Sequence, residues 1–208
     1  MQKGLLLNKK GTKLIWAVPA KNKITVPDSV TSIADNALKA GKATSVYLGK
    51  KVKMIGKDAI AGKKITKVSI AKKNKSIAKQ GQCIYEKKSG KLLIAVAKKN
   101  VVKIGNKVKL ISEDASLCGS RQLKKLDIGA SVKTLQGAWG EFYRAGYVTT
   151  TKVYFRSKNP PKLTQNNDKN YCYLPIFRDV YVPKASLKKY KKWYKKNDAL
   201  QFVKLKTF

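Results

Sequence analysis

The side chains that most often carry acid–base or metal chemistry are scarce in this 208-residue chain, which has no histidine and only 11 acidic residues. Histidine is the commonest general base near neutral pH and the commonest transition-metal ligand, so its absence removes both roles. The carboxylates are scattered along the chain and fall mostly at predicted turns and caps. We therefore expect a protein that is not an enzyme and that carries no metal site and no cofactor.

The cysteines add little reactive chemistry. Cys83, Cys118 and Cys172 are far apart and form no C-x-x-C pair, so they predict neither a zinc site nor a disulfide framework. A cysteine nucleophile would also lack the histidine that activates it. Cys118 falls where the chain is predicted to turn inward, which favours a buried thiol over a reactive one.

Charge is the strongest chemical feature of the chain. Lysine and arginine number 47 and the formal net charge is +36. A field of that sign attracts any polyanion, whether nucleic acid, acidic glycan or anionic surface, without choosing among them. Because lysine offers only a mobile point charge, the scarcity of arginine disfavours a site built for bidentate recognition of phosphate or guanine. The arginines are Arg121, Arg144, Arg156 and Arg178.

Some of these lysines recur at matching positions of a repeated pattern. Stacking such positions would place like charges side by side, and a bound polyanion would relieve their repulsion. The alternative is a solvated face whose mobile side chains are balanced by counterions. The candidate polyanion residues are Lys50, Lys51, Lys53, Lys72, Lys73, Lys75, Lys107 and Lys109.

The pattern that positions these residues is an internal repeat, best preserved in residues 23–45. Its apolar positions return in the segments that follow, and the intervals from Val26 to Leu48 and from Leu48 to Ile70 are both 22 residues. A fixed period of this size is typical of a solenoid, in which each coil buries its apolar face against its neighbours. The low-apolar composition of disordered chains is absent, since 43% of residues are hydrophobic.

Two hairpins precede sets of coils. Residues 4–22 and 81–100 each carry two apolar runs around a polar turn, and we align Gly4 with Gly81, Leu7 with Ile84 and residues 13–18 with 91–96, which leaves one extra turn residue in the second. The expected organisation is one solenoid over residues 1–208. It comprises a hairpin (4–22), coils 1–3 (23–80), an inserted hairpin (81–100), coils 4–6 (101–156), a surface loop (157–179) and a C-terminal strand with a capping helix (180–208).

The C-terminal segment 184–197 has helical periodicity. Leu187, Tyr190, Trp193 and Tyr194 fall on one face and lysines occupy the rest. A helix that closes the end of the solenoid explains this face best, and a basic amphipathic membrane segment is the alternative. No apolar run is long enough to span a membrane, and no signal peptide is recognisable at residue 1, so we expect no membrane insertion.

One residue of each coil strand should point outward. If Val46 and Leu48 face the core, Tyr47 between them faces solvent, because side chains alternate along a strand. Stacked coils then form a column on what should be the concave face, where tyrosines among polar residues suit a sugar or peptide. The alternative is that tyrosine merely suits strands. The candidate ligand-binding residues are Thr25, Tyr47, Ser69, Lys103, Asp127, Tyr154 and Tyr181.

The phrase ITVPDSVTSIADNAL, residues 24–38, resembles the BspA-like (Treponema pallidum-type) leucine-rich repeats. The shared features are Val26-Pro27, the SVTSI turn at 29–33, the NAL segment at 36–38 and the Cys118-Gly119 step, whose order is reversed. The resemblance implies a mainly β solenoid of right-handed coils with short strands and short helical turns. It also implies a bacterial protein that is secreted or displayed on the cell surface, often as one module of a longer chain.

The leading functional hypothesis is a surface or extracellular interaction and adhesion module that binds a protein or glycan through the stacked strand face. The alternative is a basic protein that binds polyanions without sequence preference, and it depends on the charge alone. A purely structural spacer remains a third interpretation.

Overall fold

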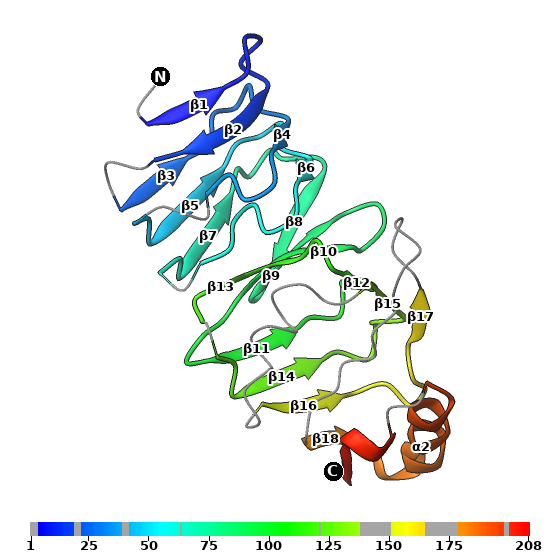
Figure 1. The fold of residues 1–208 in the computed structure, drawn as a ribbon. Helices are drawn as coiled ribbons and strands as arrows, with labels where there is room; N and C mark the ends of the chain where they lie inside the picture. Colours follow the sequence, from blue (N-terminus) through cyan, green and yellow to red (C-terminus); the bar gives the residue numbers. More distant parts are fainter. Residues whose placement is uncertain are drawn as a thin grey trace.

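The computed structural model describes residues 4–18, 22–38, 42–62, 64–120, 122–137, 151–164, 179–197 and 200–208. In these residues the repeat folds into a stack of coils built mostly from short strands, with one α-helix at the C-terminal end (Figure 1). Within each stack of parallel strands, the strands follow one another in chain order. The prediction of a mainly β solenoid with a capping helix is confirmed.

The N-terminal half contains a hairpin and three coils. Its strands are β1 (Leu5–Leu7), β2 (Lys13–Ala17), β3 (Lys23–Thr25), β4 (Ser32–Ile33), β5 (Ser45–Leu48), β6 (Met54–Ile55), β7 (Lys67–Ile70) and β8 (Ile77–Gln80). The first two coils each contribute one strand to each of two stacks, whereas the third contributes β7 to the first stack and β8 to the sheet that joins the two halves. The first stack is the parallel sheet β3-β5-β7, and the second is the sheet β1-β2-β4-β6.

The C-terminal half repeats this plan with longer coils. Its strands are β9 (Cys83–Glu86), β10 (Leu92–Val96), β11 (Val101–Ile104), β12 (Leu110–Ser112), β13 (Ser116–Cys118), β14 (Lys125–Ile128), β15 (Thr134–Gln136), β16 (Lys152–Phe155), β17 (Lys162–Thr164), β18 (Asp179–Val182) and β19 (Lys204–Thr207). The first stack becomes the five-stranded sheet β11-β14-β16-β18-β19, and the second becomes β12-β15-β17. Between the halves lies the four-stranded sheet β13-β10-β9-β8.

Apolar alternation produces the coils. In the N-terminal sheet the pairs Ile24↔Val46 and Val46↔Val68 are in register, and all three side chains are buried. Successive coils lie so close that a Cβ built on Gly49 would come within 2.5 Å of the Pro27 carbonyl oxygen of the coil before. A side chain at residue 49 would therefore push the coils apart, which accounts for glycine where the first coil has proline.

The inserted hairpin β9-β10 separates two hydrophobic cores. Ile84, Leu93 and Ile94 pack into the core of the N-terminal coils, whereas Leu92 and Ala95 pack into the core of the C-terminal coils. All five side chains of β10 are buried for this reason. The hairpin is thus an internal layer of the stack, covered on both faces.

The pairing within the two hairpins corrects the sequence alignment. Leu5 pairs with Ala17 as Cys83 pairs with Ala95, and the register shift that skips Ile15 recurs at Leu93. Residues 5–7 therefore match 83–85, and not the 82–84 implied by pairing Leu7 with Ile84. The two hairpins are therefore equal in length. The sequence alignment missed this because residue similarity does not show where a bulge shifts the register.

The predicted loop at 157–179 is also only partly correct. Residues 162–164 form β17, which pairs in parallel with β15, with Leu163 opposite Leu135. A half-buried leucine between polar residues was enough to extend the second stack by one strand. Residues 165–178 of that loop lie outside the described residues.

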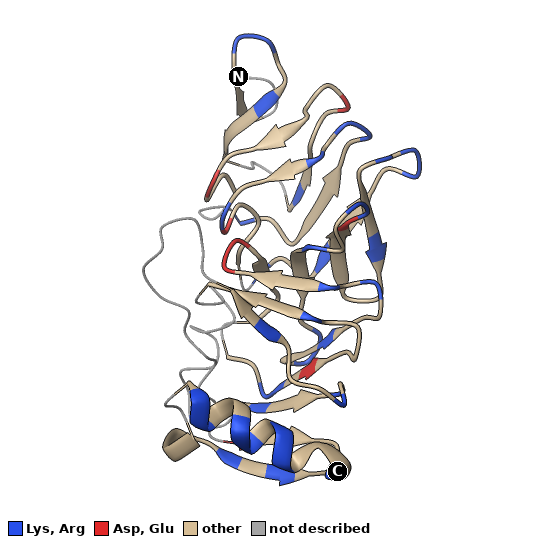
Figure 2. Cartoon of the chain, turned by 90° about the vertical axis from the view of Figure 1, so that its right-hand side faces the viewer, with Lys and Arg blue, Asp and Glu red and all other residues tan. Residues whose placement is uncertain are grey.

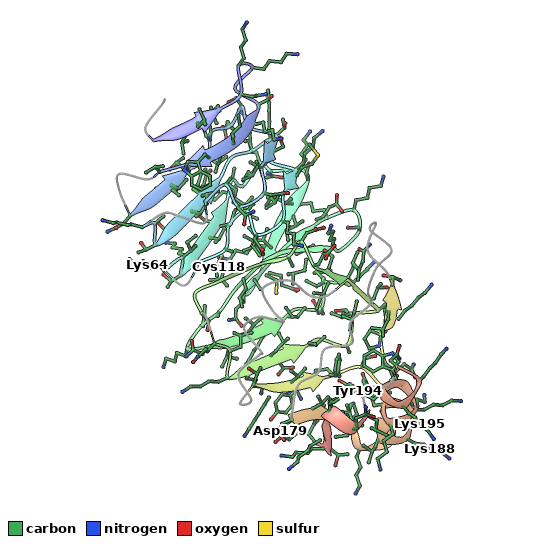
Figure 3. The ribbon with its side chains drawn as sticks, in the orientation of Figure 1. Lys64, Cys118, Asp179, Lys188, Tyr194 and Lys195 are labelled. Carbon is green, nitrogen blue, oxygen red and sulfur yellow. The ribbon has the colours of Figure 1, made fainter. Side chains whose placement is uncertain are left out.

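The predicted capping helix is present as α2 (Leu187–Lys196), preceded by a 3-10 turn at Lys184–Ser186. Tyr190 and Tyr194 are fully buried, and the Phe155 ring of the last coils lies 5.4 Å from that of Tyr190. Figure 3 shows Tyr194 on the side of α2 that faces the stack and the lysines Lys188 and Lys195 on the outer side. The apolar face of α2 is therefore used to close the core.

Within the described residues, no helix has the length and apolar character needed to cross a bilayer. The C-terminal segment after α2 forms the strand β19, which pairs in parallel with β18.

The two buried tyrosines of α2 provide a matched pair for a stability test. Tyr190 donates its hydroxyl to the carbonyl oxygens of Ser157 at 3.1 Å and Asn159 at 3.4 Å, whereas the Tyr194 hydroxyl has no partner among the described residues. We expect Tyr190→Phe to lower the free energy of unfolding by about 1 kcal/mol, and Tyr194→Phe to leave it unchanged or raise it. Urea denaturation followed by circular dichroism measures both, and equal losses would contradict the assignment.

Candidate functional site

The predicted outward column is split into two ladders. Across the N-terminal sheet Thr25, Tyr47 and Ser69 lie side by side in register. Across the five-stranded sheet Lys103, Asp127, Tyr154 and Tyr181 do the same, and Lys206 of β19 extends them. The sheet β13-β10-β9-β8 lies between, so Ser69 and Lys103 are not neighbours on one sheet.

The N-terminal ladder contains one aromatic ring. Tyr47 is half-buried, Thr25 is exposed, and the Ser69 hydroxyl donates to the Val46 carbonyl oxygen at 3.4 Å. This ladder therefore presents a single ring between two small polar side chains.

The C-terminal ladder contains an aromatic stack. Parallel pairing of β16 with β18 places Tyr154 opposite Tyr181, and their ring centroids lie 4.4 Å apart with only 9° between the planes. Both side chains are half-buried. Phe208, which is 49% exposed at the end of β19, lies 5.9 Å from the Tyr154 ring.

Beside this stack, Asp127 holds an arginine in a fixed position. Arg156 donates from Nε and Nη2 to the two carboxylate oxygens of Asp127, each at 2.7 Å. The guanidinium carbon lies 5.1 Å from the centre of the Tyr154 ring and 4.5 Å from that of Phe208. A bidentate pair of this kind restricts the guanidinium to one plane and orientation.

Two lysines complete the cluster. Lys125 Nζ lies 3.6 Å from Asp127 and 4.2 Å from the centre of the Tyr154 ring. Lys206 Nζ lies 2.8 Å from Asp179 and 5.5 Å from the centre of the Tyr181 ring. The aromatic cluster, as we use the term below, comprises Tyr154, Tyr181, Phe208, Asp127, Arg156, Lys125 and Lys206.

Four of these seven residues were not among the sequence candidates: Arg156, Lys125, Lys206 and Phe208. A usable signal existed for two of them. Arg156 is two residues after Tyr154, and Lys125 is two before Asp127, so strand alternation places both on the same face. Lys206 and Phe208 required β19 to be recognised as a strand that continues the sheet.

The charge pair perturbs both partners. Partial burial opposes ionisation of Asp127, but hydrogen bonds and charge from Arg156, with a smaller contribution from Lys125, outweigh it and lower the pKa of the carboxyl below 3.8. The hydrogen bonds from Arg156 to Asp127 raise the guanidinium pKa in turn. The pair stays ionised across the physiological range.

The predicted lysine ladder is interrupted as well. The eight candidate lysines are all exposed, and Lys50 forms an ion pair with Asp28 of the first coil at 3.5 Å. The turn of the inserted hairpin lies between Lys75 and Lys107. On one side, Lys87 donates hydrogen bonds to the carbonyl oxygens of Asn74 and Ser76. On the other side, the Lys109 amide donates to the Gly90 carbonyl oxygen. Basic residues in successive turns follow one side of the stack (Figure 2).

A second basic cluster lies between the N-terminal and the C-terminal ladder, at β8. Lys79 Nζ donates to the Val68 carbonyl oxygen at 2.7 Å, and burial, followed by the charges of Lys98 and Lys67, lowers its pKa. An open hollow beside it is lined by Gln80, Gly81, Gln82, Lys98, Val101, Lys103 and Gly105. Lys103, expected in the ligand column, lines this hollow.

The prediction that the Cys118 thiol is buried is confirmed. Cys83 and Cys118 are fully buried, and burial raises the pKa of the Cys83 thiol to about 11. Cys118 is the last residue of β13, in the sheet that joins the two halves (Figure 3). Over the described parts of the chain, no group of three potential ligands from His, Cys, Asp and Glu gathers to hold a metal. Cys172 lies outside those parts.

The Asp127–Arg156 pair predicts a pH dependence of stability. A carboxyl whose folded-state pKa is depressed stabilises the fold above its unfolded pKa, and that contribution disappears as the pH falls through the folded pKa. We expect the stability difference between the wild type and Asp127→Asn to be constant above about pH 5 and to shrink as the pH falls through the lowered pKa of the folded-state Asp127 carboxyl. Urea titrations at each pH measure it.

The conservative variant Arg156→Lys keeps the charge but loses the bidentate hydrogen bonds, so it should show a smaller pH-dependent difference. A wild type and an Asp127→Asn variant whose stabilities fall in parallel with pH would contradict this assignment.

Solved structures that resemble this chain include two bacterial proteins. One is a leucine rich cell surface protein from Faecalibacterium prausnitzii A2-165, with 13% identity, a TM-score of 0.45, and alignment over 87% of this chain and 52% of that one. The other is a leucine-rich repeat protein from Eubacterium ventriosum ATCC 27560, with 15% identity, a TM-score of 0.39, and coverage of 79% and 61%. The chain thus spans less than two thirds of the length of each solved chain. None of the curated proteins matches it.

A family model describes the repeats themselves. The model of the BspA type leucine rich repeat region matches six copies over residues 20–139, which is more than half of the 208 residues. This range contains the coils with the 22-residue register and the inserted hairpin. The chain belongs to the BspA-type leucine-rich repeat family.

Proposed function

We propose that this protein is an interaction module, secreted or displayed on the cell surface, that binds a protein or glycan through the outer face of the five-stranded sheet. Membership of a leucine-rich repeat family favours a binding module over an enzyme. The single observation that carries the choice of face is the Tyr154–Tyr181 stack beside an arginine held by Asp127.

Half-exposed rings suit this role because they combine large apolar area with a polar tip. Each tyrosine has few rotatable bonds, so ordering it on binding costs little conformational entropy. The stack restricts both rings further, and the bidentate bond restricts Arg156. A ligand would therefore meet a preorganised surface, on which little of the binding energy is spent on ordering side chains.

The chemistry of this face favours a ligand that has both flat apolar surfaces and hydroxyl or amide groups. Tyrosine hydroxyls donate and accept hydrogen bonds, and the exposed Phe208 adds apolar area at the edge of the sheet. Sugars and extended peptides both fit this description. The N-terminal ladder offers only Tyr47, which makes it the weaker candidate.

The test compares a double variant with a matched control in the other ladder. Binding partners are first found on a glycan array and an array of extracellular proteins, and the affinity for the strongest is then measured with purified wild type. We expect Tyr154→Ala with Tyr181→Ala to weaken binding at least about 10-fold, because aromatic anchors dominate interface energies. Tyr47→Ala should leave the affinity nearly unchanged. Equal affinities for the double variant and wild type would exclude this face.

A second function, polyanion binding, is favoured by the like-charge cluster at Lys79. Burial and the neighbouring Lys98 and Lys67 lower the Lys79 pKa, so the cluster is repulsive without a counter-anion. A polyanion across it and the exposed lysine turns would relieve that repulsion.

Salt dependence separates this function from the first. We expect affinity for a short DNA duplex or for heparin to fall steeply with salt, with the slope on DNA reduced by about 3 when Lys72, Lys73 and Lys75 become glutamine. The control changes Lys184, Lys188 and Lys191, which are exposed near the C-terminal end, to glutamine and alters the net charge equally. Weak retention that does not respond to salt would exclude polyanion binding, as would equal slopes for the two triple variants.

A further inference from the structure

The first hairpin, β1-β2, exposes an apolar face. Leu6, Ile15, Trp16 and Val18 are 44%, 40%, 38% and 60% exposed, four of the seven large hydrophobic side chains that are exposed in the described chain. The other face of the same hairpin is buried, with Leu14 at 0% and Ala17 at 1% exposed. Apolar side chains therefore cover both faces of β1-β2, but only one face is packed.

The second hairpin shows what this face looks like when it is covered. With the two hairpins matched by their strand pairing, Leu6 corresponds to Ile84 and Trp16 to Ile94, both of which are fully buried. Ile15 and Val18 correspond to Leu93 and Val96, which are 8% and 5% exposed. All four exposed side chains of the first hairpin thus have buried equivalents in the second.

The cover in the second hairpin is the coil before it. Ile84, Leu93, Ile94 and Val96 all belong to the core cluster of the N-terminal coils, together with Val68 of β7 and Ile77 of β8. The same coil also satisfies the backbone, because β8 pairs antiparallel with β9 from Ile77↔Glu86 to Gln80↔Cys83. In the first hairpin the outer edge of β1 pairs with no strand of the described chain.

We propose that the outer face of β1-β2 is the docking surface for a further leucine-rich-repeat coil of the type formed by β7 and β8. The last strand of that coil adds antiparallel to β1, and its apolar side chains cover Leu6, Ile15, Trp16 and Val18. This occupant satisfies both the free strand edge and the apolar face, as the chain itself does at the second hairpin. The opposite end of the stack is closed by α2, so the C-terminal end of a second copy offers no such coil.

A tandem chain tests the proposal directly. A first copy, residues 1–81, is fused directly to a second copy that begins at Gly4 and runs to the end of the chain. Gly81 then precedes Gly4 as it precedes Gln82 in the natural chain, so the turn at the junction is as long as the natural turn between β8 and β9. The peptide across this junction has a unique sequence and can be followed by hydrogen exchange and mass spectrometry. We expect the amides of residues 5–7 in the second copy to exchange at least about 10-fold more slowly than in the 208-residue chain. Unchanged exchange would overturn the proposal.

A substitution in the two chains gives an independent readout. Trp16→Lys should change the melting temperature of the 208-residue chain by less than about 2 °C, since the side chain lies at an exposed site. The same substitution in the second copy of the tandem chain should remove the protection of residues 5–7, because it would bury an unpaired ammonium. Leu14→Lys, on the packed face, is the positive control and should unfold both chains.

The competing occupant is a second copy of this chain. Sedimentation velocity of the 208-residue chain distinguishes it: a monomer at micromolar concentration supports a coil as the occupant. A dimer that Trp16→Lys dissociates would overturn the proposal in favour of self-association.

Discussion

Within each half of the stack, neighbouring coils are joined by parallel backbone hydrogen bonds, and the positions of the surface side chains depend on that register. In the N-terminal half the register repeats every 22 residues, as in the pairs Lys23↔Ser45 and Ser45↔Lys67. Because a strand buries alternate side chains, the register also decides which residues share a column on the surface. The Tyr154–Tyr181 stack results directly from it, since the two rings occupy the same position in successive coils.

Much of this arrangement could be predicted from the sequence because burial follows the period. Val46, Val68 and Ile24 repeat at a fixed interval, and Tyr190 and Tyr194 fall on one helical face, so the coils and the cap could both be inferred. The hairpin register could not, because a bulge at Ile15 or Leu93 leaves no mark in residue type. β17 was missed because a three-residue strand with one half-buried leucine is too short to show alternation.

The predicted outward column is present in part, and its use for binding stays a prediction. Alternation alone placed Tyr154, Tyr181 and Asp127 in one column, as found. It did not reveal that the inserted hairpin interrupts the column. The length of an insertion does not show whether the inserted residues form a loop outside the stack or add a layer to it. Nor could it indicate that Asp127, one of only 11 acidic residues, would hold Arg156 against a ring.

The inserted hairpin has a mechanical consequence, since its two faces belong to different cores. Leu93 and Ile94 are held by one half of the stack, and Leu92 and Ala95 by the other. In a solenoid, stability is roughly a sum of unit and interface terms, and a fully apolar strand between two cores makes a strong interface. Because β9 is also hydrogen-bonded to β8 and β10 to β13, the backbone of the hairpin is held by both halves, so tension along the stack would be carried from one half to the other through this single layer.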